Sequence, residues 1–359
     1  MIASYGHLWG MMTTFLAPFA MSFAAMLVLV PLMIVVSQKY GILDYPSERK
    51  IHNIPVPRLG GLGIIIGFWV IALLHLPLPK ASWAILVGGT IVGLMGVADD
   101  IRPLSSRIRL VGQVIAALIV LSAGLSVSFM PKLWWGQLLA WVITIFWILG
   151  IVNAVNFADG LDGLASGMVT ISSIFFFLMA IYLRQSDVAM VAIFLAGCCL
   201  GFLVFNFKPA KIYLGDGGST FIGFILACIA LYGGWSNDGF VVALGIPVII
   251  LGVFIFDMIY ITIARIKNGS VRSFQQWLDF TGKDHFHHRL LSLGFTEVGA
   301  VFFIYLIHIV LGLNVLVLEK LKNPLAIFIM AVQSVFVFTI ILLLMRVGRG
   351  ISDKKSGNV

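Results

Sequence analysis

The segment 206–221 (NFKPAKIYLGDGGSTF) lies between two long apolar runs and contains residue types that bind phosphate and metal ions. Glycines near the start of an expected helix would present free backbone N–H groups, which form a natural seat for phosphate. Asp216 adds a hard oxygen ligand of the kind that Mg²⁺ takes beside phosphate oxygens. Asn206 and Lys211 would add an amide and a cation. The alternative is a plain connecting loop whose lysines sit at a membrane surface.

Two adjacent carboxylates, Asp99 and Asp100, follow directly after another apolar run. Neighbouring acids at a membrane boundary repel each other and are costly to desolvate, so a cation, a metal ion or a proton-transfer task must compensate them. Arg102, Arg107 and Arg109 follow closely. A structural salt-bridge cluster is therefore the alternative interpretation.

The segment 153–167 (NAVNFADGLDGLASG) carries acids but neither Lys nor Arg. Asn156, Asp159 and Asp162 recur every three residues, which would place them on one side of a helical turn. Gly160 and Gly163 favour a bent helix end instead. We expect cation binding or substrate recognition here, and a helix cap with incidental acids is the alternative.

Two further segments supply donors for anions. The first, residues 47–61 (SERKIHNIPVPRLGG), presents Lys50, His52 and Arg58 in a loop that its prolines stiffen; a positively charged membrane anchor is the alternative.

The second segment, residues 283–290 (KDHFHHRL), gathers His285, His287, His288 and Arg289. Histidines at this density could form a zinc site, but the usual closing Cys or Glu ligand is not adjacent. They could equally hold a pyrophosphate or tune proton transfer.

The composition predicts an all-α integral membrane protein that positions these segments. Of the 359 residues, 60% are hydrophobic and 11% are charged, far less charge than the surface of a soluble protein requires. Apolar stretches of about 17–25 residues suit helices that span a bilayer. About eleven transmembrane helices are expected, at residues 15–36, 60–76, 83–98, 108–128, 133–154, 167–183, 189–205, 220–232, 239–264, 298–318 and 325–345.

Lys and Arg are distributed unevenly over the loops. Eighteen of the 23 follow an odd-numbered span, which places those loops and the C-terminus in the cytoplasm and the N-terminus outside. Because the acidic and histidine-bearing segments share this side, an active site is expected on the cytoplasmic face. The same asymmetry accounts for the net charge of +8, so no nucleic-acid partner is expected.

One catalytic membrane domain is expected at residues 1–345, with a disordered cytoplasmic tail at residues 346–359. Asp257 lies inside the predicted ninth span, where a buried hydrogen bond between helices is the expected role.

Five motifs in this order resemble the polyprenyl-phosphate N-acetylhexosamine-1-phosphate transferases. They read RKIHNIPVPRLGG, ADD, NAVNFADGLDGL, NFKPAKIYLGDGGS and HFHHRL, and together they cover nearly the whole chain. The resemblance implies that a UDP-sugar donor gives its sugar-1-phosphate to a polyprenyl phosphate in the bilayer and releases UMP. It implies Mg²⁺ as cofactor, with Mn²⁺ as a substitute, and a place in the bacterial cytoplasmic membrane. A homodimer is left open.

The resemblance also implies residue roles. Asp216 would bind Mg²⁺, and Asn156 would supply a second ligand. Asp99 and Asp100 match the family's aspartate pair, and Asp99 could act as a base, organise the metal and cations, or form a covalent intermediate. The residues expected to bind substrate are Lys50, Arg58, Asp159, Asp162, Asn206, Lys211, His285, His287, His288 and Arg289.

The HFHHRL motif looks like the branch that moves GlcNAc-1-phosphate from UDP-GlcNAc to undecaprenyl phosphate, as in O-antigen, enterobacterial common antigen or teichoic acid synthesis. The branch that moves N-acetylmuramoyl-pentapeptide typically has three consecutive histidines followed by Phe-Glu. Phe286 and Arg289 depart from that pattern, so this branch is the alternative. A transporter is a remote alternative, because it needs polar groups near mid-bilayer and only Asp257 qualifies.

Overall fold

The computed structural model describes residues 2–45, 54–75, 78–131, 133–235, 240–280, 282, 284–318 and 324–356. The helices are α1 (Ile2–Tyr40), α2 (Gly60–Leu74), α3 (Lys80–Ile101), α4 (Ser106–Ser122), α5 (Trp134–Ala158), α6 (Leu164–Tyr182), α7 (Ser186–Asn206), α8 (Gly215–Tyr232), α9 (Phe240–Ile250), α10 (Gly252–Lys267), α11 (Phe274–Asp279), α12 (Phe286–Ser292), α13 (Glu297–Leu318) and α14 (Pro324–Ser356). Two short strands, β1 (Leu43–Asp44) and β2 (Val56–Pro57), pair antiparallel.

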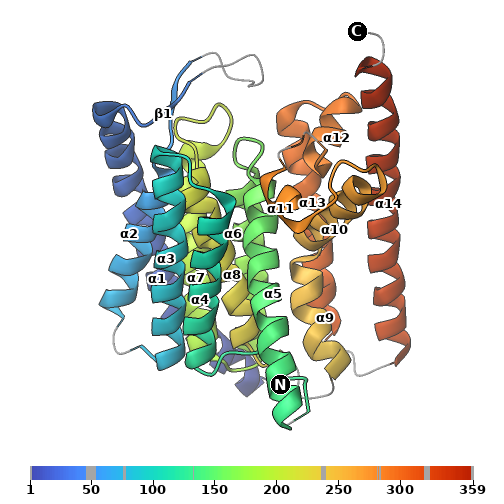
Figure 1. Ribbon diagram of the computed structural model, residues 1–359. Helices are drawn as coiled ribbons and strands as arrows, with labels where there is room; N and C mark the ends of the chain where they lie inside the picture. The colour runs from blue at the N-terminus through green and yellow to red at the C-terminus, as the bar shows by residue number, and fades with distance from the viewer. Residues whose placement is uncertain are drawn as a thin grey trace.

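The long apolar segments form helices, as the sequence predicts (Figure 1). Within the described chain, eight helices are long and apolar enough to cross a membrane. The pair α9 and α10, bent by 78°, would make a ninth span. Helices α2 and α4 are shorter, with 15 and 17 residues. The chain is therefore a multi-pass helical membrane protein, and the count of eleven spans and their orientation remain predictions.

Two of the differences from the expected boundaries bear on the site and on the C-terminal tail. Helix α8 begins at Gly215 rather than residue 220, so Asp216 lies in the first turn of the helix. Helix α14 continues to Ser356, so the tail that we predicted to be disordered from residue 346 is helical as far as that residue. Packing explains the second difference, because a Cβ atom at Gly348 would lie 2.8 Å from the Arg289 carbonyl oxygen of α12.

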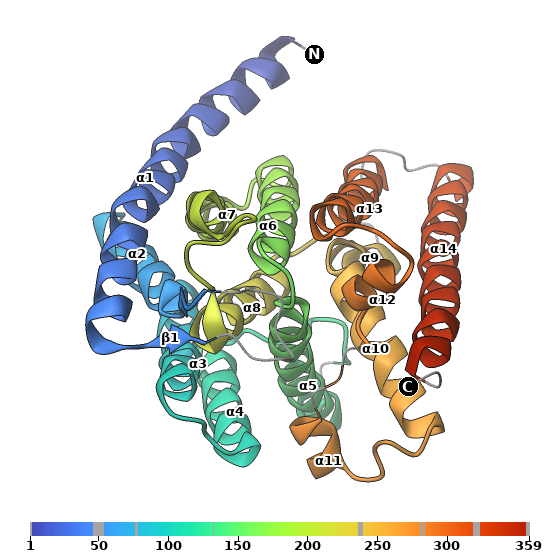
Figure 2. The ribbon, with the colours of Figure 1, turned by 90° about the horizontal axis from the view of Figure 1, so that it is seen from above.

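Helix α8 is the buried axis of the N-terminal two thirds of the bundle. Its residues from Gly217 to Ala230 are buried, and α2, α3, α5, α6 and α7 pack around it (Figure 2). Apolar contact alone drives helix association weakly in lipid, so close packing must contribute. The first turn of α8, which carries Asp216, is thus held by neighbours on several sides.

Glycines allow two of these neighbours to touch the first turn of α8 backbone to backbone. A Cβ atom at Gly61 of α2 would lie 2.0 Å from the Gly218 nitrogen. A Cβ atom at Gly96 of α3 would lie 2.4 Å from the Asp216 carbonyl oxygen. Real Cβ atoms do not come so near to a backbone, so any larger residue must push the helices apart.

Gly96→Ala is therefore expected to lower the melting temperature of the purified protein by several degrees, since overpacking typically costs about 1–3 kcal/mol. Gly245→Ala in α9 is the matched control, because no atom lies within 4 Å of the added carbon. Equal melting temperatures for the two variants would contradict this account of α3 and α8.

Candidate functional site

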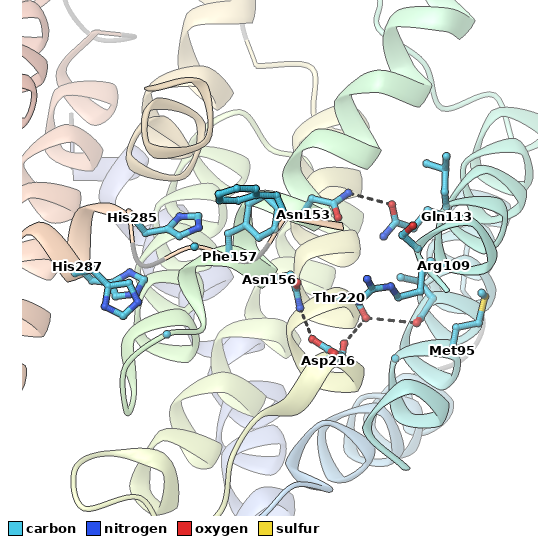
Figure 3. A pocket seen from close by; sticks show the side chains of 18 residues that line it. Met95, Arg109, Gln113, Asn153, Asn156, Phe157, Asp216, Thr220, His285 and His287 are labelled. Carbon is cyan, nitrogen blue, oxygen red and sulfur yellow. Dashed lines mark hydrogen bonds between the residues drawn. The ribbon is translucent and has the colours of Figure 1, made fainter. Parts of the chain in front are cut away.

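A cavity of about 300 Å³ lies where α3, α4, α5 and α8 meet the segment 280–288 (Figure 3). Asp216, Arg109 and Thr220 lie on one side of it, His285 and His287 on the other, and Asn156 and Phe157 between them. The cavity is lined by Val92, Met95, Gly96, Ser106, Arg109, Leu110, Gln113, Asn153, Asn156, Phe157, Gly160, Asp216, Thr220, Phe280, Gly282, His285, His287 and His288.

Asp216 enters the cavity from the first turn of α8 and is held by Asn156 of α5. The Asn156 side-chain nitrogen donates to Asp216 Oδ1 at 2.8 Å and lies 2.8 Å from Ser219 Oγ (Figure 3). These bonds use the amide nitrogen, so the amide oxygen keeps its acceptor capacity. The structure therefore brings together the two residues that were predicted to bind the metal ion.

Asp100 serves the fold rather than the cavity. Its Oδ1 accepts the Asp216 N–H and its Oδ2 the Gly217 N–H, both at 3.0 Å, and Arg58 lies 3.3 Å away. Its side chain is 1% exposed. A carboxylate at the first turn satisfies free N–H groups and complements the helix dipole. Both oxygens of Asp100 are thus engaged and covered, and its catalytic role stays a prediction without a geometric observation behind it.

Asp99 points to the opposite side of α3 and pairs with Arg109 of α4. Its Oδ2 accepts from Arg109 Nη1 at 3.0 Å, and its Oδ1 accepts from the Leu104 backbone N–H. The Asp99 carboxyl also interacts with that of Asp216. Arg109 and Asp216 therefore line one wall of the cavity, and Asp99 lies behind them, where it holds the Arg109 guanidinium.

Arg58, which was predicted to bind substrate, forms ion pairs with two carboxylates of the chain itself. Its guanidinium lies 3.6 Å from Asp44 and 3.3 Å from Asp100, linking the β1–β2 ribbon to the end of α3. About a third of its side chain stays exposed (34%), so the clamp leaves part of the cation open to water.

The histidine segment is fixed by Asp257, which confirms the expected buried hydrogen bond of that acid. Asp257 Oδ2 lies 2.8 Å from His285 Nδ1, and its Oδ1 accepts the Phe286 N–H at 2.8 Å. Within the described part of the chain, no group of three His, Cys, Asp or Glu residues is arranged to hold a metal ion. The zinc interpretation therefore finds no support.

His287 lies directly against Gly160, where a Cβ atom would come within 2.1 Å of Nε2. Its Nε2 is buried and has no hydrogen-bond partner among the residues that the structure describes. Burial lowers the pKa of His287 well below its usual value, and His288 and His285 lower it further. The ring is therefore neutral near pH 7, and it offers the cavity a hydrogen-bonding group rather than a charge.

Asp159 and Asp162 lie where α5 ends and the chain turns toward α6. Burial, followed by the charges of Asp216 and Asp100, raises the pKa of Asp159 from 3.8 to about 8. Asp162 Oδ2 accepts the Ala210 N–H at 3.0 Å and so ties this turn to the segment before α8. Neither residue lines the cavity.

Asn206, predicted to bind substrate, is buried in a network of hydrogen bonds within the chain. It is 3% exposed. Its Oδ1 accepts from the Gly163 N–H and Ser166 Oγ at 3.1 and 3.0 Å, and its nitrogen donates to the Ile212 carbonyl. The amide therefore ties the start of α6 to the segment before α8, and its oxygen has no acceptor capacity left for a ligand.

Two other predicted residues do not line this cavity, and a third lies outside the residues that the structure describes. Lys211 is exposed and does not line it. Arg289 lines a different cavity, beyond the segment 280–284. Lys50 lies outside the described residues.

The sequence interpretation missed five polar residues that line the cavity, namely Ser106, Arg109, Gln113, Asn153 and Thr220. Arg109 was read as a partner of the acid pair rather than a cavity residue. Gln113 and Asn153 face each other, with the Asn153 nitrogen 3.1 Å from Gln113 Oε1 (Figure 3). Both stand inside apolar helices, and polar residues within spans are a signal of function.

The donors of this wall fit a magnesium ion. Mg²⁺ is commonly held by one or two carboxylates, and substrate phosphates and water complete the shell. Asp216 supplies one carboxylate, and the Asn156 amide oxygen is a further hard ligand. Asp216 and Asp99, two acids that repel each other in a partly buried site, would also gain from a divalent cation.

Comparison with known proteins finds relatives along most of the chain. The model of glycosyl transferase family 4 matches residues 82–234. A probable undecaprenyl-phosphate N-acetylglucosaminyl 1-phosphate transferase of Bacillus subtilis is 34% identical over 89% of this chain and 88% of its own. A decaprenyl-phosphate N-acetylglucosaminephosphotransferase of Mycobacterium tuberculosis is 32% identical over 75% and 74%. A phospho-N-acetylmuramoyl-pentapeptide-transferase of Lacticaseibacillus paracasei is 32% identical over 62% and 77%.

The raised pKa of Asp159 predicts a pH-dependent effect on stability. The folded state keeps a proton that the unfolded state releases above pH 3.8, so this group makes the fold less stable as the pH rises toward about 8. Asp159→Asn removes the penalty, and it should raise the melting temperature relative to wild type more at pH 9 than at pH 5. A gain that is equal at both pH values, or larger at pH 5, would contradict the assignment.

Proposed function

The chain belongs to glycosyl transferase family 4, and from this membership we propose that it transfers GlcNAc-1-phosphate from UDP-GlcNAc to undecaprenyl phosphate. The products would be GlcNAc-pyrophosphoryl-undecaprenol and UMP, with the reaction at the cytoplasmic face of a bacterial inner membrane. The observation that carries the proposal is the 34% identity to the Bacillus subtilis relative across 89% of this chain.

The choice of sugar follows from the same comparison. The pentapeptide-transferase relatives are 30–32% identical over 59–80% of this chain, less than the Bacillus subtilis relative on both measures, and Phe286 and Arg289 depart from the histidine motif expected of that branch. UDP-N-acetylmuramoyl-pentapeptide is therefore the second candidate donor.

The cavity has the charges that such a reaction requires. Two phosphate-bearing reactants repel each other, and preorganised cations and hydrogen-bond donors offset that repulsion most strongly where water is excluded. Arg109 supplies a fixed cation beside Asp216. His287, neutral and buried against Gly160, can direct a ring N–H at a phosphate oxygen of the donor.

We assign Asp99 the role of orienting Arg109, rather than that of a base. Both of its oxygens already accept hydrogen bonds, from Arg109 and from the Leu104 N–H. The acceptor needs little help from a base, because a phosphate monoester has a second pKa of about 6 and is largely dianionic near pH 7. Asp100 is a positioning residue, because it holds the helix turn that carries Asp216.

The proposed step is a single displacement. An oxygen of the lipid phosphate attacks the β-phosphorus of UDP-GlcNAc, and the bond from that phosphorus to the bridging oxygen breaks as UMP leaves. When bound at Asp216 and Asn156, Mg²⁺ would neutralise phosphate charge. Arg109 and His287 would hold the non-bridging oxygens in the geometry for this attack.

Incubating the purified protein with UDP-GlcNAc, undecaprenyl phosphate and Mg²⁺ tests the proposal. UMP and a lipid-linked sugar pyrophosphate should appear together, and should disappear on addition of EDTA and in Asp216→Ala. Mn²⁺ should restore activity in part. UMP release only with UDP-N-acetylmuramoyl-pentapeptide would establish the second donor instead, and no release with either would refute the proposal.

Arg109→Gln should lower kcat about 100-fold or more, the usual cost of removing one preorganised donor that stabilises transition-state charge. Arg107→Gln is the matched control, because Arg107 lies two residues away on the same helix, is exposed and binds only Gln275 in the described contacts. Comparable kcat values for the two variants would remove Arg109 from the proposed site.

A further inference from the structure

A second cavity, of about 270 Å³, lies beside the first, and Phe280 and Gly282 line both. Three arginines from three helices converge on it: Arg265 of α10, Arg289 of α12 and Arg349 of α14. The remaining lining residues are Tyr260, Ile261, Ala264, Asn268, Ser270, Phe280, Gly282 and Asp284. A cavity with this excess of cations is an unusual feature to maintain at the end of a membrane bundle.

Arg265 is the deepest of the three cations. Its side chain is 2% exposed. Nε and Nη2 donate to the two oxygens of Asp284 at 2.8 and 2.7 Å, and the guanidinium lies over the Phe280 ring. Its Nη1 is buried and makes no hydrogen bond to any described residue. A buried guanidinium N–H without a partner is costly, so Nη1 is a donor prepared for an acceptor from outside the chain.

The other two arginines leave the site with a positive excess. Arg289 Nε is likewise buried without a partner in the described chain. Arg349 Nη2 donates to Asn268 Oδ1 at 2.9 Å, which holds the end of α14 over the cavity. Burial raises the pKa of Asp284, but the Arg265 guanidinium more than offsets this and holds the pKa below its usual value. Asp284 is thus ionised near neutral pH, and it neutralises one of the three cations.

We propose that this cavity binds a phosphate group, at a site separate from the one that holds Asp216. Planar guanidinium groups match the oxygens of phosphate in pairs, and hydrogen bonds between two charged groups are the strong ones. Phosphate presents enough oxygens to engage Arg265 Nη1 and Arg289 Nε together. The group could belong to an anionic lipid headgroup or to a soluble phosphate.

The residues around the second cavity are compatible with either a lipid headgroup or a soluble phosphate. Asn268 and Ser270 at the rim are exposed, so a soluble anion can enter from water. On the same helix as Arg265, Ile259, Ile263 and Ile266 are 49%, 48% and 58% exposed, as expected of a surface that faces lipid. A bound group would also lie against Phe280 and Gly282, which line both cavities.

The test measures phosphate binding by the purified full chain and does not depend on the proposed reaction. Inorganic phosphate is titrated against the detergent-solubilised protein, and retention of phosphatidylglycerol is compared with that of phosphatidylcholine by native mass spectrometry. Retention of phosphatidylglycerol alone would identify a lipid headgroup as the source, and binding of inorganic phosphate would identify a soluble one. Binding of neither probe would overturn the proposal.

Two substitutions with opposite expected effects on phosphate affinity distinguish a change in the site from damage to the fold. Arg349→Gln should weaken binding about tenfold, the loss of roughly one charge-assisted contact. Asp284→Asn should strengthen it, because the site loses its one anion. Arg346→Gln, on the same helix and exposed, is the matched control and should bind as wild type does.

Arg109→Gln, which removes the cation of the first cavity, should leave this binding unchanged. Equal binding by Arg349→Gln and Arg346→Gln would overturn the assignment. So would loss of binding in Arg109→Gln, because the anion would then lie in the first cavity.

Discussion

The first turn of α8 is fixed by one buried carboxylate, and the candidate site depends on that contact. Asp100 accepts the N–H groups of Asp216 and Gly217, and Arg58 balances its charge. The Gly60 and Gly61 N–H groups donate to the carbonyls of Tyr213 and Leu214 just before the same turn. The ends of α2, α3 and α8 are thus joined at one point, and Asp216 can project into the cavity only because this point holds.

The cavity divides its charged and neutral groups between two walls. Asp216 of α8 and Arg109 of α4 form a charged wall, with Asp99 of α3 behind it, whereas the opposite wall carries His287, whose lowered pKa makes it neutral. Asp257 orients the histidine segment from α10. A divalent ion and the phosphates of two substrates would complete the charge balance of the first wall. On the second wall, the neutral His287 would orient a phosphate group through a hydrogen bond without adding charge.

The sequence predicted the helices and the end of the bundle where the site lies, but not the direction of each side chain. Apolar length identifies spans because a bilayer allows few alternatives. Asp99 and Asp100 are neighbours in sequence, yet on a helix they point about 100° apart, so one contacts Arg109 of α4 and the other the α8 backbone. Asn206 and Arg289 lie in the right motifs but face a buried turn and a second cavity. Only tertiary packing decides these directions, as it also decides that α14 extends to Ser356.

The role of Asp100 can be tested most directly by hydrogen exchange of the backbone amides of residues 215–218, in wild type and in Asp100→Asn. An asparagine side chain has only one acceptor oxygen for the two N–H groups, so these amides should exchange markedly faster in the variant. Asp99→Asn is the control, and it should leave their exchange unchanged. Wild-type protection in Asp100→Asn would show that something other than this carboxylate holds the turn, and it would contradict the account.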